Sequence, residues 1–434
     1  MAELTVLNPR AAGIDIGSRE FFVDAGDNKV ARFPTYTEGC LALRDYLKSR
    51  GCTTVAMEST GVYWVILHAI LQDAGIEVYL VNGRDVKNVP GRKSDVKDCQ
   101  WIRQLHMHGL LKNSFLPPEG IRNLRSYLRL RQDHIRAQAT QVHLMQKALT
   151  LLNIRLTEVI NDIMGVSGKA MIKAILDGER DPEVLVAYCH SSILKTKREL
   201  VIKALQGSYR KEHLFSLRQA YDTWHYFQQL IDQCDQAVEE QLEEMTKDMD
   251  DTYQPGKRKP IRYNSPKVEN LPNHLLKLTK GNDPIGIPGI TDYSFLQIIS
   301  EVGTDLRAWK TEKHFVSWLK LAPMRSSSGK SSRRVHVKRT NQASQLFRNM
   351  AQGILTSKHL ALGSFARRIK AKRGSGVAIK AVARKIACYY YRTMTQGVHF
   401  LEKGIEQYEK QLKERQMNFL QNMARKLNLT LLPA

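Results

Sequence analysis

The chain has 434 residues, of which 42% are hydrophobic, so the composition allows two or three folded domains and excludes global disorder. It has no apolar run of the roughly 20 residues that a membrane span requires, Met1–Arg10 lacks a signal-peptide pattern, and six scattered cysteines favour reduced thiols in a cytoplasmic protein over a zinc site or a disulfide framework. The net charge of +23 favours a polyanionic partner.

The first part of the chain alternates between strand and helix patterns. Apolar runs predict strands at Ala12–Ile16, Phe21–Ala25, Val30–Phe33, Thr54–Met57 and Glu77–Val81, with a hairpin turn at Gly26–Asn28. Helices are expected at Glu38–Ser49 and Val62–Gln72. Three antiparallel strands followed by alternating helices and strands match an α/β ribonuclease H-like fold, which is a mixed sheet with helices on both faces.

Four carboxylates in this part share a pattern that suggests metal binding. Asp15 ends the first strand between two glycines, and Glu58 ends the fourth strand. Asp95 and Asp98 are three residues apart, which places both on one face of a helix. In the expected fold the first and fourth strands are neighbours, so Asp15 and Glu58 converge and the Asp95/Asp98 helix can close the site.

Carboxylates gathered in one pocket repel one another unless cations bind among them, and hard oxygen ligands favour Mg²⁺ or Mn²⁺. Two such ions roughly 3.5–4 Å apart can stabilise the attacking and the leaving oxygen of a phosphodiester. Taken alone, Asp95 has the alternative of a helix N-cap and Glu58 that of a surface carboxylate.

Long helices are expected in the middle of the chain. A basic helix from Gly120 to about Asn161 carries Arg122, Arg125 and Arg129 on one face, which predicts nucleic-acid contacts. A second helix has a coiled-coil-like seam with a 4-3 rhythm, formed by Leu217, Tyr221, Trp224, Phe227, Ile231, Cys234, Val238, Leu242 and Met245. Its outer positions are acidic, which indicates protein contacts, either helix packing within the chain or an oligomer interface. Asp250–Pro272 has the composition of a linker.

Almost all of the positive charge lies in the C-terminal part. The 89 residues Lys313–Leu401 contain 19 Lys or Arg and no Asp or Glu, whereas the rest of the chain has 47 basic and 43 acidic residues. This tract favours binding to nucleic acid over a basic surface that serves only solubility. Before the helix Phe295–Val302, Ile287–Thr291 resembles a helix-hairpin-helix turn, whose glycine lets backbone N–H groups approach a DNA phosphate. A charged amphipathic helix is expected at Glu402–Leu427.

A serine-rich loop within the basic tract is a second candidate site. It contains Ser326, Ser327 and Ser328, and the cations expected to neutralise a phosphate there are Arg325, Lys330, Arg333, Arg334, Lys338 and Arg339. A serine hydroxyl in this setting could attack a phosphodiester. Because no nearby His or Asp offers itself as the base, the chemistry alone favours a flexible phosphate-binding loop over a nucleophile.

Together, these motifs resemble those of the DEDD (RuvC-like) transposases of bacterial insertion sequences, whose relatives include the Piv DNA invertase. The matching motifs are GIDIG with Asp15, MESTG with Glu58, KSDVKD with Asp95 and Asp98, IPGI at Ile287–Ile290, and LAPMRSSSGK before the basic residues. Their order and approximate spacing fit the family over about two-thirds of the chain.

The resemblance implies an organisation and a set of site residues. The implied parts are a RuvC-like nuclease domain (1–115), a helical coiled-coil region (116–250), a linker (251–281), a mainly α-helical transposase domain with the serine loop and the basic tract (282–401), and a C-terminal helix (402–434). Asp15, Glu58, Asp95 and Asp98 would bind the divalent metals. The family's nucleophilic serine stands just before the glycine, which here is Ser328, with Ser326 and Ser327 as the alternatives.

The function implied by the resemblance is site-specific recombination of a mobile element in the bacterial cytoplasm. Donor and target DNA are cut and joined through a phosphoserine intermediate, at composite sites built from two subunits of a tetramer. The family is also similar in its use of a structured guide RNA (bridge RNA) that pairs with both DNAs. The stretch from about 165 to 283 is longer than in compact members, and the resemblance assigns it no role.

Other functions fit fewer of the motifs. An ATP-dependent kinase of the actin and sugar-kinase fold would share GIDIGS, but the C-terminal half lacks the second phosphate turn and the glycine pair that it requires. A degenerate nuclease that only binds nucleic acid would be expected to have lost acidic residues of the site, but all four acidic positions are filled. A RuvC-like junction nuclease would need the carboxylates but not Ser328, and a protein-only DNA invertase would need no RNA.

Overall fold

The computed structural model describes residues 5–27, 29–83, 95–250, 252–258, 260–261, 263–323, 325–328, 331–334, 341–397, 405–427 and 429, with the backbone alone for 95–96, 325–328, 331–334, 405 and 409. The chain divides into two compact units, Met1–Leu116 and Pro117–Ala434, here called the N-terminal and the C-terminal unit. Among the described residues, no helix is both long and apolar enough to span a membrane. All six cysteines are free thiols.

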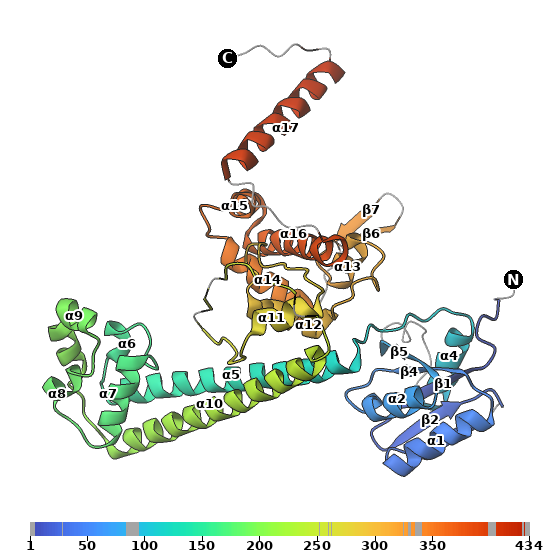
Figure 1. The fold of residues 1–434 in the computed structure, drawn as a ribbon, viewed down its shortest axis with the longest axis horizontal. Coiled ribbons are helices and arrows are strands. Elements are labelled where there is room, and N and C mark those ends of the chain that lie inside the picture. The colour runs from blue at the N-terminus through green and yellow to red at the C-terminus, as the bar shows by residue number, and fades with distance from the viewer. Residues whose placement is uncertain are drawn as a thin grey trace. The chain divides into compact units, whose positions relative to one another are not determined.

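The N-terminal unit is built on a five-stranded mixed sheet (Figure 1). Its strands are β1 (Ala11–Ile16), β2 (Glu20–Asp24), β3 (Val30–Pro34), β4 (Thr54–Glu58) and β5 (Glu77–Val81), in the order β3-β2-β1-β4-β5. The first three strands pair antiparallel, and β4 and β5 continue the sheet parallel to β1. The mixed α/β prediction and the adjacency of the first and fourth strands are confirmed, and the arrangement is compatible with a ribonuclease H-like fold.

Three helices cover the two faces of this sheet. Helices α1 (Thr37–Ser49) and α2 (Trp64–Asp73) bury leucines against Ile14, Val55 and other alternate strand residues. Helix α4 (Asp95–Met107) packs against the opposite face, where Ile102 meets Ala56 and Val81. Because successive strand residues point to opposite faces, each strand contributes to both cores.

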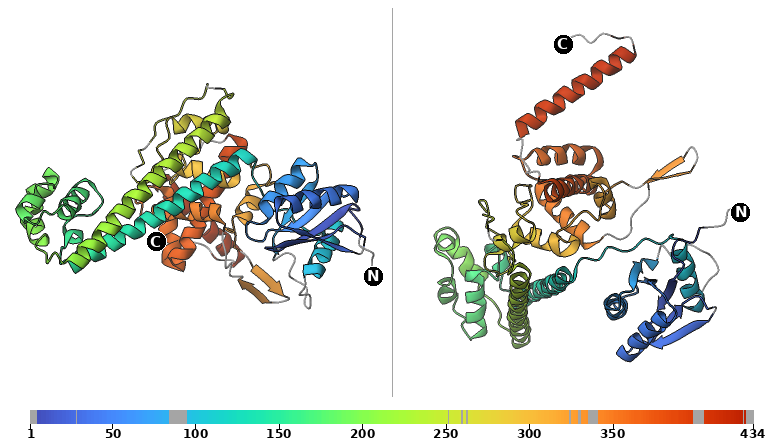
Figure 2. Two further views of the ribbon diagram at one scale, coloured as in Figure 1. Left: turned by 90° about the horizontal axis from the view of Figure 1, so that it is seen from below. Right: turned by 45° about the vertical axis from the view of Figure 1, so that its right-hand side comes forward.

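The C-terminal unit contains a long pair of helices that run side by side, α5 (Glu119–Leu151) and α10 (Lys211–Thr246) (Figures 1 and 2). The seam that the 4-3 rhythm predicted packs against α5 of the same chain, with Leu217, Ile231 and Val238 buried. Of the two interpretations of this seam, helix packing within the chain is the one that the structure contains.

The basic helix that was expected to reach Asn161 ends at Leu151, so that prediction was wrong in its length. Asn153 adopts a left-handed conformation (φ 57°). The Ile154 N–H donates to the Leu149 carbonyl at 2.8 Å, and the Asn153 N–H donates to Thr150 at 3.0 Å. These two bonds form a Schellman motif, which satisfies the last carbonyls of a helix and stops it.

A small lobe connects the two long helices, following α5 and preceding α10 in the chain. It consists of α6 (Leu156–Val159), α7 (Val166–Leu176), α8 (Pro182–Val186) and α9 (Ser191–Ala204). Ile172, Leu185 and Val201 are fully buried in its core, which continues onto the adjoining ends of α5 and α10. The lobe therefore has a hydrophobic core of its own at one end of the helix pair.

The rest of the C-terminal unit is helical apart from one hairpin. Its elements are α11 (Leu271–Leu278), α12 (Asp292–Val302), α13 (Glu312–Trp318), β6 (Arg325–Ser328), β7 (Ser331–Arg334), α14 (Gln342–Ile354), α15 (Ala361–Arg373), α16 (Ser375–Gln396) and α17 (Ile405–Lys426). An aromatic cluster of Phe295, Phe315, Phe347 and Tyr390 forms its centre.

The structure corrects two predictions in this region. The predicted linker contains helix α11, whose Leu271, Leu275 and Leu276 are buried. The polar residues before this short amphipathic helix gave the whole segment the composition of a linker. The predicted serine loop is instead an antiparallel hairpin, in which β6 pairs with β7.

A buried ion pair joins three helices of the C-terminal unit. Arg131 of α5 is 1% exposed, and its Nε donates to Asp235 of α10 at 2.5 Å. Its guanidinium also donates to the Tyr293 hydroxyl of α12 at 3.0 Å and lies over the Tyr293 ring. Burial lowers the pKa of Arg131, but the bonds to Asp235 and Tyr293 outweigh it and raise the pKa, so the guanidinium stays charged.

Replacing Asp235 by Ala is expected to lower the free energy of unfolding of the C-terminal unit by about 3–5 kcal/mol, because it leaves a buried guanidinium without its counter-charge. Chemical denaturation followed by far-ultraviolet circular dichroism measures this loss. The matched control is Asp133→Ala, which removes a carboxylate from the exposed Arg136–Asp133 pair and should change stability little. Equal effects of the two substitutions would contradict the structural role of the buried pair.

Candidate active site

Asp15 and Glu58 lie on neighbouring parallel strands at matching positions. Ile14 of β1 pairs with Met57 of β4, so the next residue on each strand is a carboxylate. Ile14 and Met57 are buried in the core under α1 and α2. The alternation of side chains therefore directs Asp15 and Glu58 to the other face of the sheet, which is the face that α4 covers.

Helix α4 crosses β1 at a very short distance. A Cβ atom at Gly13 would lie 2.2 Å from the Cys99 carbonyl oxygen and 2.4 Å from the Arg103 nitrogen, so only glycine allows the helix backbone to approach the strand. Arg103 Nε donates to the Ala11 carbonyl at 3.0 Å. Because Cys99 lies over Gly13 and Arg103 binds Ala11, the first turn of α4 lies toward Asp15, at the end of β1.

Two further observations fix this placement of α4. Near its C-terminal end, the buried His106 ring is hydrogen bonded to Thr54 Oγ1 at 2.9 Å, at the start of β4. Burial lowers the pKa of His106 to about 4, so the ring stays neutral. Near its N-terminal end, burial and then the charges of Asp24 and Asp15 raise the pKa of the Cys99 thiol to about 12, as expected for a thiol on the helix turn that faces this end of β1.

The predicted helical pair Asp95 and Asp98 belongs to the first turn of α4. Asp98 is partly buried. The structure thus brings Asp15 near the first turn of α4 and places Glu58 beside it on the same face. For Asp95 the backbone position alone is described, and Lys93 and Ser94 of the motif lie outside the described residues.

Gly83 is a positioning residue that the sequence analysis missed. A Cβ atom there would lie 2.1 Å from Glu58 Oε1, so the Glu58 carboxylate rests against the backbone just beyond β5. A larger residue at this position would displace the carboxylate. The only signal in the sequence was a glycine two residues after an apolar strand.

The carboxylates at this end of the sheet are a candidate metal site. Among the described side chains, which do not include that of Asp95, no three His, Cys, Asp or Glu residues are arranged to hold a metal ion. The chemistry of the donor set nevertheless fits a hard divalent cation, because the residues at this end of the sheet offer carboxylate oxygens. The four-ligand assignment stays a prediction.

The serine motif lies on the β6–β7 hairpin. Ser328 is the last residue of β6 and is paired in register with Ser331, and Ser326 is paired with Arg333. Arg325 and Arg334 form the outermost pair. Ser328 is therefore the residue of β6 nearest the tip of the hairpin. Lys330, Lys338 and Arg339 lie outside the described residues.

Two of the three α5 arginines predicted to bind nucleic acid make hydrogen bonds within the C-terminal unit. Arg125 Nε donates to the Ser300 carbonyl at 2.8 Å, and Arg129 forms two bonds to the Glu301 carboxylate at 2.9 and 2.8 Å. They attach α5 to the end of α12, where helix carbonyls lack internal partners. Contact of Arg125 and Arg129 with nucleic acid stays a prediction. The role of Arg122 stays a prediction.

The IPGI motif forms a tight turn before α12. Gly289 has φ 89°, and a Cβ atom there would lie 3.2 Å from Met350 Cβ on α14. Left-handed geometry and contact with α14 explain the glycine without a ligand. Contact between this turn and a DNA phosphate stays a prediction.

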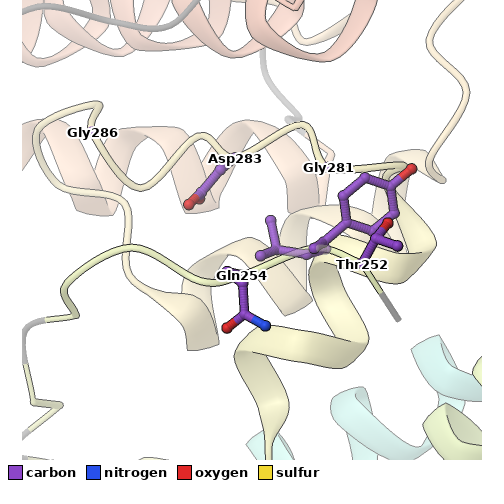
Figure 3. A pocket seen from close by; sticks show the side chains of 7 residues that line it. Thr252, Gln254, Gly281, Asp283 and Gly286 are labelled. Atoms are coloured by element: carbon purple, nitrogen blue, oxygen red, sulfur yellow. The ribbon is translucent and has the colours of Figure 1, made fainter. Parts of the chain in front are cut away.

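A pocket of about 370 Å³ lies near this turn, between residues 252–254 and the connection from α11 to α12 (Figure 3). Its lining residues are Thr252, Tyr253, Gln254, Leu276, Gly281, Asp283 and Gly286. Arg258 closes this region by pairing with Asp283 at 2.8 Å and with Asp292 at 3.1 Å. None of the predicted catalytic residues lines the pocket.

Two family models match the chain. A model of DEDD transposases matches residues 12–154, which contain all four carboxylates. A model described as "Transposase IS116/IS110/IS902 family" matches residues 285–361, which contain the IPGI turn and the serine hairpin. A search of curated proteins finds no match.

A carboxylate-bearing mixed sheet and a basic helical part, each matched by a transposase model, define the class of this protein: it is a DNA transposase. The two matches together cover about half of the chain. The matches support a DEDD transposase of insertion sequences, similar in its C-terminal part to the IS116/IS110/IS902 family.

Proposed function

We propose that this transposase cuts and rejoins DNA with Asp15, Glu58, Asp95 and Asp98 as ligands of divalent metal and Ser328 as the nucleophile. The observation that carries the proposal is the register of β1 and β4, which places Asp15 beside Glu58 on the face covered by α4. Gly13 and Gly83 support it. A side chain at Gly13 would collide with the backbone of α4, and a side chain at Gly83 would collide with the Glu58 carboxylate.

The carboxylates would hold Mg²⁺ or Mn²⁺, which supplies charge stabilisation for the attacking and leaving oxygens of a phosphodiester. Helix α4 has a positioning role. Its close contact with Gly13 and the Arg103–Ala11 bond fix where its first turn lies relative to β1. Such fixed positions matter because a carboxylate displaced by an ångström no longer meets the geometry of an octahedral ion.

The serine would act by two balanced transesterifications. Ser328 Oγ bonds to phosphorus as the bond from phosphorus to a deoxyribose oxygen breaks; the hydroxyl proton is given up and the leaving oxygen takes up a proton. In the second step a deoxyribose hydroxyl of the other strand attacks the phosphoserine and releases the serine. No water is consumed, so the energy of the phosphodiester bond is conserved and strands can be exchanged.

We further propose donor and target DNA, a structured guide RNA and further copies of this chain as partners, assembled as a tetramer in the bacterial cytoplasm. The resemblance of the motifs to the DEDD transposases supports these partners, and so does a basic tract of 89 residues without Asp or Glu. The second candidate is a protein-only invertase, related to the Piv enzymes, with the same chemistry and no RNA.

One assay tests this function. The complex purified from its native host is incubated with donor and target DNA, and recombinant junctions are counted by sequencing. Chelation of divalent metal is expected to stop strand cleavage, and added Mg²⁺ or Mn²⁺ to restore it. Ribonuclease treatment stops recombination if an RNA guides it and leaves it unchanged for a protein-only invertase. Cleavage that persists in excess chelator would refute the metal-dependent mechanism.

A further inference from the structure

Three cations from three helices of the C-terminal unit lie close together. Lys385 of α16 has its Nζ 4.2 Å from the centroid of the Phe365 ring of α15. The guanidinium carbon of Arg368, also on α15, lies 5.9 Å from the same centroid. Arg415 of α17 is the third cation: α17 packs against α15, and the charge of Arg415 acts on Lys385.

No carboxylate neutralises this cluster among the side chains that the structure describes. Burial first, and then the charges of Arg415 and Arg368, lower the pKa of Lys385. Arg392 on the same helix shows the contrast, because it makes two hydrogen bonds to Glu312, at 2.5 and 2.9 Å. Two like charges near a half-buried lysine cost free energy, and a bound anion would recover it.

The surroundings of the cluster favour a chain of anions over a single one. Lys385 and Arg368 are half-buried, whereas Arg415 is exposed, so the cluster opens toward solvent. From Arg368, α15 continues to the exposed Lys370, Lys372 and Arg373 in its last turn. Arg368 and Lys372 are four residues apart and share one face of α15, so they can contact successive phosphates of a backbone, whereas a free phosphate would use the cluster alone.

We propose that Lys385, Arg368 and Arg415 form a phosphate-binding site for a nucleic-acid backbone, with α17 supplying one wall. The partner is recognised by its phosphodiesters and not by its bases, so the site would add affinity without sequence preference. The inference rests on the nucleic-acid function proposed above, but it does not depend on the cleavage chemistry.

The test is the salt dependence of binding in a metal chelator, where no cleavage takes place. Fluorescence anisotropy with a labelled DNA duplex and a labelled single-stranded RNA gives Kd for the full chain between low and physiological salt. Lys385→Gln and Arg368→Gln are each expected to reduce the slope of log Kd against log salt by about 0.9 for duplex DNA or about 0.7 for single-stranded RNA. The arm that changes identifies which nucleic acid occupies the site.

Two controls separate a specific contact from general loss of charge. Lys385→Arg keeps the charge and should keep the slope, which also shows that the helix still folds. Arg392→Gln removes one positive charge from the same helix at a residue that Glu312 already neutralises, and should leave the slope unchanged. Unchanged slopes in Lys385→Gln and Arg368→Gln with both nucleic acids would overturn the proposal.

The same assay separates this inference from the catalytic proposal. Asp15→Ala is expected to bind with the wild-type slope, because the measurement excludes divalent metal. If Asp15→Ala recombines normally while Lys385→Gln loses slope, the catalytic proposal fails and the phosphate site stands. Binding of inorganic phosphate that Lys385→Gln abolishes, without any change in the nucleic-acid slope, would assign the cluster to a free phosphate and overturn the proposal.

Discussion

Replacing Ser328 by Ala is expected to abolish both the covalent protein–DNA product and the exchange of strands. Without the hydroxyl no phosphoserine can form, and loss of a catalytic nucleophile reduces turnover by up to the order of 10⁶-fold. Denaturing gels of the protein with end-labelled DNA measure the covalent product, and junction sequencing measures exchange.

Ser326→Ala and Ser327→Ala are the matched controls for this substitution, since each removes one hydroxyl from the same strand of the hairpin. Both are expected to retain the covalent product. If Ser326→Ala or Ser327→Ala loses the covalent product and Ser328→Ala keeps it, the nucleophile is the serine whose replacement removed the product. If all three variants exchange strands normally, the serine mechanism is wrong, and a hydrolytic nuclease acting through the carboxylates becomes the better account.

Asp15→Ala is expected to reduce strand cleavage by roughly 10²–10³-fold or more, as does the removal of other groups that stabilise charge in a transition state. The physical reason is the position of Asp15 beside Glu58, on the face that α4 covers. Cleavage rates at several Mg²⁺ concentrations and calorimetric titration with Mn²⁺ measure the effect. Both the rate and the affinity for metal should fall.

The control for charge is Asp45→Ala on α1, which removes an exposed carboxylate that pairs with the neighbouring Arg44. It should leave cleavage and metal affinity unchanged. Asp15→Asn keeps the size of the side chain, so a loss of activity in that variant cannot come from a cavity next to α4. Full recombination by both Asp15 variants would refute the metal site.

The sequence was most informative where chemistry and periodicity act over short distances. Apolar runs separated by turn residues gave the strands to within a residue or two, because alternation leaves few choices of register. The neighbouring positions of Asp15 and Glu58 followed from the expected order of the strands. The seam of α10 was predicted for the same reason, since its rhythm extends over many turns.

Contacts between residues far apart in the chain were not predictable in this way. Arg125 and Arg129 form a basic face in the sequence pattern. In the folded chain Arg125 is hydrogen bonded to Ser300 and Arg129 to Glu301, and the pattern did not predict these contacts. The pairing of Arg131 with Asp235 spans 104 positions, and no local pattern marks it. The role of Gly83 and the end of α5 before Asn153 each depend on one residue. The neighbours of these residues are known only from the fold.

The lobe at the end of the α5–α10 pair has an evolutionary consequence. The two family matches stop at residue 154 and resume at residue 285, and the first of them ends at Ile154, the last residue of the Schellman motif that closes α5. Since the core of the lobe continues onto the ends of α5 and α10, a relative that lacked the lobe would have to cover these helix ends in another way.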